Sequence, residues 1–136
     1  MARPEQAARA AARAAAGGRP LASLLVRRLD GGPEYRLVPV AGADGVTAIV
    51  QVDEHGTVAA VSRLPTPRPL DELFLSTEAA RALAPDGYEP AGLVWLPVRE
   101  STSPIRPFQL LRGAGPDLYV DMSGRLLAEL TPLGKG

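Results

Sequence analysis

Apolar residues occupy every second position from 46 to 52, and Thr47, Ile49 and Gln51 lie between them. A two-residue period places alternate side chains on opposite faces of a strand, so this stretch is predicted to be a strand with one strongly apolar face. Other short apolar stretches are bounded by the Gly, Pro, Asp and Ser residues that are typical of turns. The predicted strands span residues 34–40, 46–52, 57–64, 91–98, 108–111, 118–121 and 125–130.

Two further segments show helical patterns. Leu21, Leu24, Leu25 and Leu29 recur at helical spacing, and an Asp-Gly-Gly-Pro sequence follows them, which predicts a core helix over residues 21–29. Ser76 is placed to cap a second helix over residues 77–84, which a Pro-Asp-Gly sequence would end. The pattern predicts an α+β domain: an antiparallel sheet of about six short strands, divisible into two β-meander blocks, with two helices on one face.

The ends of the chain and its proline-rich middle predict how this domain is bounded. Residues 2–18 contain no apolar side chain larger than alanine, so residues 1–18 are interpreted as an Ala/Arg-rich arm, either a peripheral helix or disordered. Three alternating prolines make residues 65–69 a polyproline II connector between blocks 19–64 and 70–131 of a single domain, 19–131. Pro39 cannot donate to a ladder, which predicts either an edge position or a bulge for its strand. Residues 132–136 are predicted to be a disordered tail.

One short motif occurs twice. Val-Asp-Glu-His-Gly-Thr-Val at residues 52–58 returns as Val-Asp-Met-Ser-Gly-Arg-Leu at residues 120–126. Asp followed three residues later by Gly is typical of a type I turn closed by a glycine with positive φ, which joins antiparallel strands. Val-Pro-Val and Leu-Pro-Val sequences precede the two motifs at residues 38–40 and 96–98. Two independent hairpin turns are the preferred interpretation, and a duplicated block is the alternative.

Composition excludes several classes of function. The chain has no Cys, which removes thiol catalysis, Cys-based zinc sites and disulfides. Net charge is zero, but residues 1–32 carry six Arg against two acidic residues. Fourteen Arg against one Lys is the bias of a GC-rich genome, so Arg richness by itself indicates little about nucleic acid. No apolar run is long enough for a membrane span, and we expect a cytoplasmic protein with no membrane partner.

Catalytic chemistry has little support in the sequence. His55 is the single histidine, and its place in a tight turn predicts a side chain that points to solvent. The aspartates of the two turns are explained by turn geometry, no cluster has metal-ligand spacing, and no phosphate-binding loop is present. We therefore expect no cofactor and no metal, and the question of an enzyme stays open with the balance against it.

The loop of residues 99–107 is the best candidate for a functional surface. It gathers two guanidinium groups, a carboxylate and three hydroxyls directly after the strand that contains Trp95. A solvated connection is the alternative interpretation. The predicted partner-binding residues are Arg99, Glu100, Ser101, Ser103, Arg106 and Phe108.

Residues 92–130 also carry a family resemblance. Gly115-Pro116, Leu118, Val120-Asp121 and Gly124, with Trp95 upstream, resemble the closing hairpin of small α+β immunity proteins from bacterial polymorphic toxin systems. The same turn is similar to those of PepSY-like domains. The Ala/Arg arm and the insertion at residues 101–107 depart from both families, so no functional residue is carried over. The resemblance implies an immunity or inhibitor protein.

Three functional hypotheses follow. The first is a non-enzymatic protein-interaction module that binds an unidentified protein through the 99–107 loop. The second is nucleic-acid association through the basic arm, for which the candidate residues are Arg3, Arg9, Arg13 and Arg19. The third is a small-ligand or enzymatic cavity lined by Trp95, Tyr35 or Tyr119.

Overall fold

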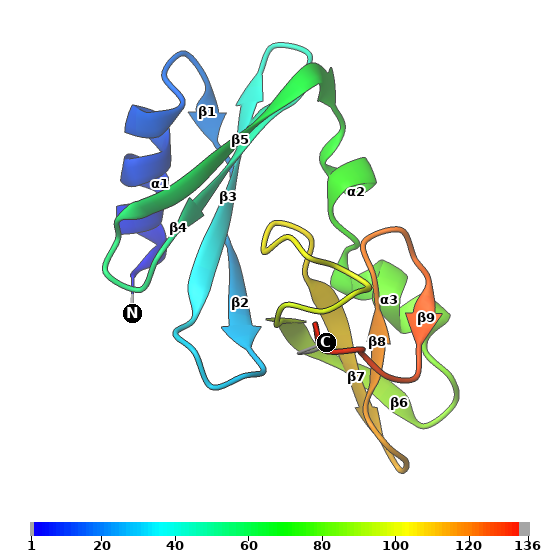
Figure 1. Cartoon of the computed structure of the whole chain (residues 1–136). Coiled ribbons are helices and arrows are strands. Elements are labelled where there is room, and N and C mark those ends of the chain that lie inside the picture. Colours follow the sequence, from blue (N-terminus) through cyan, green and yellow to red (C-terminus); the bar gives the residue numbers. More distant parts are fainter. Residues whose placement is uncertain (1, 134–136) are drawn as a thin grey trace. The chain divides into compact units, whose positions relative to one another are not determined.

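A computed structural model describes residues 2–133 as an α+β fold in which the strands paired within each of its two units are antiparallel. It contains nine strands and three helices within these residues (Figure 1). The chain divides into two compact units, unit 1 (Met1–Arg27 with Gly31–Leu70) and unit 2 (Arg28–Asp30 with Asp71–Gly136). The α+β prediction is confirmed, whereas the predicted six strands and two helices were too few.

Unit 1 begins with a helix and continues with strands that pair mostly in chain order. The strand order is β5-β4-β3-β2, and β1 pairs with β3 beside β2. The elements are α1 (Pro4–Ala14), β1 (Arg19–Pro20), β2 (Leu24–Arg28), β3 (Tyr35–Gly42), β4 (Gly45–Val52) and β5 (Val58–Arg68).

Unit 2 has a similar sequence of elements. Two short helices precede a meander whose strand order is β6-β7-β8-β9. Its second helix begins as predicted, since the Ser76 hydroxyl accepts a hydrogen bond from the backbone N of Ala79 (3.0 Å). The elements are α2 (Leu70–Leu73), α3 (Thr77–Leu83), β6 (Tyr88–Trp95), β7 (Phe108–Gly113), β8 (Leu118–Val120) and β9 (Leu126–Leu127).

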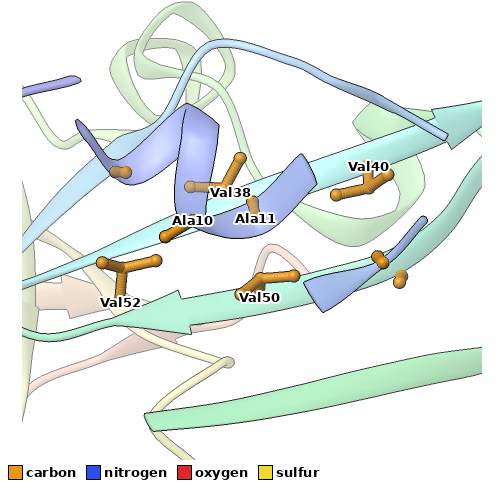
Figure 2. Close-up of a cluster of buried hydrophobic side chains, with 9 residues drawn as sticks. Ala10, Ala11, Val38, Val40, Val50 and Val52 are labelled. Carbon is orange, nitrogen blue, oxygen red and sulfur yellow. The ribbon is translucent and has the colours of Figure 1, made fainter. Parts of the chain in front are cut away.

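The N-terminal arm forms the helix that was one of its two predicted states, but this helix is part of the core of unit 1 and is neither peripheral nor disordered. Ala7, Ala10 and Ala11 of α1 are buried against valines of β3 and β4 (Figure 2). A helix face that consists only of alanine can approach a sheet closely, so these methyl groups contact the valine side chains directly. The prediction failed because it equated a lack of large side chains with a lack of buried surface. The valines are Val38, Val40, Val50 and Val52.

The helix predicted over residues 21–29 is absent, and β2 takes its place. Leu24 pairs with Leu37 and Val26 pairs with Tyr35, both on β3. Val26 is fully buried. The leucine spacing of this segment also fits a short strand that is apolar on both faces, and pairing with β3 decides between the two.

Prolines occupy strands without breaking them. The predicted polyproline connector is mostly the end of β5, and Pro65 and Pro67 fall in the irregular stretch between Arg63 and Arg68, where the pairing with β4 shifts. Pro39 lies on β3, which has partners on both sides, so the edge alternative was wrong, whereas the bulge alternative agrees with the register shift of β3 against β4 at Val40 and Ala41. The Pro39 carbonyl accepts a hydrogen bond from the backbone N of Leu21, which lies between strands β1 and β2. Because Pro39 falls between the pairings of β3 with β1 and with β2, no ladder bond requires the N–H that proline lacks.

Both predicted hairpin turns are confirmed, and they are built alike. Asp53 Oδ1 accepts hydrogen bonds from the backbone N of His55 and of Thr57, both at 2.9 Å. Asp121 Oδ1 accepts the equivalent bonds from Ser123 and Arg125, also at 2.9 Å. Gly56 and Gly124 close the turns at φ of 84° and 90°. Each turn connects the last two strands of its unit.

The likeness of the two units extends beyond these turns. In each unit a helix precedes four strands that pair in chain order, β2–β5 in unit 1, where the two-residue β1 comes first, and β6–β9 in unit 2. The valine before each turn aspartate has a polar residue as its strand partner, Arg36 for Val52 and Gln109 for Val120. Arg36 Nε donates to the carbonyl of Ala2 (2.9 Å), and Gln109 Nε2 donates to the carbonyl of Leu75 (3.1 Å). Both acceptors lie directly before the N-cap residue of the helix, and both bonds span 34 positions.

The buried residues around these bonds also correspond. Tyr35, Leu37 and Val38 are buried in β3 as Phe108, Leu110 and Leu111 are in β7. These correspondences are what a duplicated unit of one helix and four strands would show, with β1 as an additional strand in unit 1. They also show that the Pro39 and Pro97 sequences are not equivalent, because Pro39 lies in β3 whereas Pro97 follows β6.

Candidate protein-binding surface in unit 2

The 99–107 loop is held by hydrogen bonds within unit 2. Trp95 Nε1 donates to the carbonyl of Ser101 (3.2 Å). The Ser101 hydroxyl reaches the carbonyl of Arg106 at 2.7 Å and that of Ser103 at 3.2 Å. The backbone N of Arg106 donates to the carbonyl of Ser103 (3.0 Å). The loop is therefore closed on itself and fastened to the end of β6.

A second set of bonds ties the base of the loop to the chain after β9. Glu100 Oε1 accepts a bond from the backbone N of Thr131 (2.6 Å), and the backbone N of Arg99 donates to the carbonyl of Thr131 (2.9 Å). The bond from Thr131 is the main cause that lowers the pKa of Glu100. Pro132 continues the contact as a bridge to Val98. Residues 134–136 of the predicted tail lie outside the described residues.

The six predicted partner-binding residues have three kinds of environment. Arg99 and Arg106 are exposed, and Arg106 Nη2 lies 3.5 Å from the Ser123 hydroxyl in the neighbouring turn. Ser101 and Glu100 bind backbone groups of unit 2, and Ser103 Oγ faces the backbone N of Ile105 at 3.4 Å. The remaining residue, Phe108, is fully buried, and its ring packs edge-on against Tyr119 with the centroids 6.4 Å apart.

The structure adds a feature that the sequence did not indicate. An open groove of about 510 Å³ lies in unit 2 between the ends of strands and the segment after β9. Its apolar lining includes Leu29, which is 40% exposed, and the half-buried side chains Leu96, Tyr119 and Leu130. Leu130 precedes Thr131, so the groove adjoins the base of the 99–107 loop. Its residues come from four separate segments (29, 96, 116–119 and 128–130), and no local motif marks them.

The aromatic residues proposed as a cavity lining have different environments. Tyr35 and Trp95 are each 4% exposed. The guanidinium of Arg28 lies over the Trp95 ring, 5.0 Å from its centroid, while it also pairs with Asp30. Of the three, Tyr119 lines the groove, and burial, followed by the charge of Asp117, raises its pKa.

The basic residues of the nucleic-acid hypothesis lie on unit 1. Arg3, Arg9, Arg13 and Arg19 are all exposed. Unit 1 has eight Arg against five acidic residues, a net charge of +3, and unit 2 correspondingly carries −3. Arg13 and Thr57 also line a shallow groove of about 440 Å³ between α1 and the start of β5.

Other candidate sites add no further cluster. The His55 side chain is 78% exposed and lies 3.5 Å from Glu54, as expected for a turn residue. Within residues 2–133, no group of three or more His, Cys, Asp or Glu side chains is placed to hold a metal ion. The helices described in this range are all too short or too polar to cross a membrane.

Comparisons of the chain with protein-family models, with curated proteins and with solved structures find no match.

Proposed function

We propose that this chain is a protein-interaction module that binds a partner protein through the 99–107 loop of unit 2. The observation that supports this most directly is the bracing of the loop by Trp95, Ser101 and Thr131. A loop whose backbone is held before binding loses less conformational entropy when a partner docks on it.

Arg99 and Arg106 provide the chemistry of contact. Both side chains are exposed on the braced loop. A guanidinium presents parallel N–H donors to a carboxylate, so these residues suit an acidic region of the partner. The resemblance of residues 92–130 to immunity proteins makes an immunity or inhibitor protein the most concrete form of the proposal.

Paired substitutions test this function. The wild-type chain, Arg99→Ala/Arg106→Ala and the control Arg9→Ala/Arg13→Ala would be used to capture proteins from native extract, and the affinity of the captured partner would be measured. Exposed arginines at an interface centre contribute about 1 kcal/mol or more each, so the loop variant should bind at least about tenfold more weakly. The control removes the same charge from unit 1 and should bind as wild type. Equal binding by all three proteins would refute the loop assignment.

The basic face of unit 1 supports a second candidate, nucleic-acid association. The exposed side chains of Arg9 and Arg13 lie on the folded helix α1, and the unit has a net charge of +3. Because α1 is part of the core, charge removal is a better test than deletion. Binding of a fluorescent 20-nucleotide strand should weaken in Arg9→Ala/Arg13→Ala and fall steeply with salt. Salt-independent binding, or none at 50 mM salt, would exclude this candidate.

A further inference from the structure

The groove of unit 2 combines exposed apolar surface with negative charge. Leu29 is 40% exposed at its wall, and Leu96, Tyr119 and Leu130 are partly exposed. Such a concave apolar surface can accept one large side chain of a ligand. The walls belong to different segments, and two of them are held by backbone hydrogen bonds. Strand β8 is paired with β7, and the backbone N of Leu29 donates to the carbonyl of Trp95 at the end of β6 (2.9 Å).

The charged side chains of the groove lining are both carboxylates. They belong to Asp117, directly before β8, and to Glu129, in the segment after β9. Arg112 lies 3.7 Å from Asp117, but both side chains are largely exposed at 59% and 44%. An exposed pair at that distance is weak and exchanges readily for another cation. The groove is therefore complementary to an apolar side chain that has positive charge beside it.

We propose that this groove binds an extended segment of a partner protein in which one large apolar side chain is flanked by Lys or Arg. This inference rests on the proposed protein-binding function and gives the partner a second contact next to the 99–107 loop. The apolar side chain lies against Leu29 and Leu96, and the basic side chains reach Asp117 and Glu129. The groove thus selects the sequence of the segment, whereas the loop arginines contact an acidic region elsewhere on the partner.

A defined set of peptides tests the groove directly. Capped hexapeptides would carry Leu, Ile, Met, Phe or Ala at one central position, with Lys on both sides in one series and Glu in the other. Each would be titrated into the full, ¹⁵N-labelled chain, and amide shifts would be followed. We expect Lys-flanked peptides with large apolar centres to shift residues 117–119 and 128–130, and to bind at least about tenfold more tightly than their Ala or Glu counterparts.

Matched variants separate charge from apolar contact. Asp117→Lys/Glu129→Lys should lose most of the binding, whereas Glu78→Lys/Asp86→Lys, which makes the same change at exposed positions outside the groove lining, should not. Leu29→Ala should weaken binding, and Leu83→Ala, at a leucine of similar exposure (43%), should leave it unchanged. Absence of binding by every peptide, equal binding of the Lys and Glu series, or shifts confined to other residues would overturn the proposal.

The two proposals fail in different ways. If the groove variants bind the captured partner normally while Arg99→Ala/Arg106→Ala does not, the protein-binding function stands and the groove inference is wrong. If basic peptides bind the groove but no partner depends on Arg99 or Arg106, the loop assignment is wrong and the groove remains a binding site.

Discussion

The packing of α1 makes a sharp prediction about Ala11. This residue is fully buried against the valines of β3 and β4. Ala11→Leu forces an isobutyl group into a space filled by a methyl group, and such overpacking costs about 1–3 kcal/mol. Leucine is nearly as good a helix former as alanine, so helix propensity contributes little to the change.

The control is Arg9→Leu, which introduces the same side chain on the exposed face of the same helix. Stability would be measured by urea and thermal unfolding, followed by circular dichroism. For a chain of this size each kcal/mol shifts Tm by about 4 °C, so Ala11→Leu should lower Tm by roughly 4–12 °C. The control should stay within about 0.5 kcal/mol of wild type.

A peripheral helix would give a different result. If α1 did not pack on the sheet, positions 9 and 11 would be equivalent, and both leucines would be tolerated. Ala11→Leu with the stability of Arg9→Leu would therefore refute the assignment of α1 to the core.

Three further predictions concern the turns and the bonds to the helix starts. Asp53→Ala and Asp121→Ala should each destabilise the protein by about 1 kcal/mol in urea unfolding, because two backbone N–H groups lose their acceptor. Asn at either site should recover part of the lost stability, because its side-chain oxygen can accept the same bonds. The pKa of Asp53 is lowered, chiefly by the backbone N–H of Thr57, so its contribution is present above the ordinary value of 3.8 and is lost as pH falls through the folded-state pKa. Wild type should therefore lose more stability than Asp53→Asn in unfolding curves between pH 5 and pH 2, and parallel losses would contradict this. Gln109→Glu should destabilise the protein by more than about 2 kcal/mol at pH 7, because it replaces the donor to Leu75 with a buried charge, and acid should restore part of the loss.

Local chemistry explains the features that were predicted correctly. The Asp-x-x-Gly turns depend on a side-chain acceptor and a glycine within five residues, and Ser76 caps α3 through a bond to Ala79. The alternating stretch from 46 to 52 forms β4. In each case the interacting groups are close in sequence, so the pattern of residues contains nearly all of the information.

The candidate surface was predicted only in part. The position of the 99–107 loop and its arginines could be chosen because charged and polar residues gather there. The roles of the other predicted residues depend on partners elsewhere in the sequence. Ser101 is bound by Trp95, Glu100 by Thr131, and Phe108 packs against Tyr119. The groove was not predicted, because the segments that form its walls come together only in the folded chain.

By itself the sequence determined the hairpin turns, the capped helix, the main strands and the α+β class, because each follows from short-range periodicity or from a turn's own hydrogen bonds. Only the tertiary structure decided that the alanines of α1 form a core, that residues 24–28 are a strand, and that Pro39 lies in the middle of a sheet. It also decided that Arg36 and Gln109 make equivalent bonds in two units whose sequences differ. These outcomes depend on surfaces that distant segments supply to one another, and no local pattern records which surface a segment will meet.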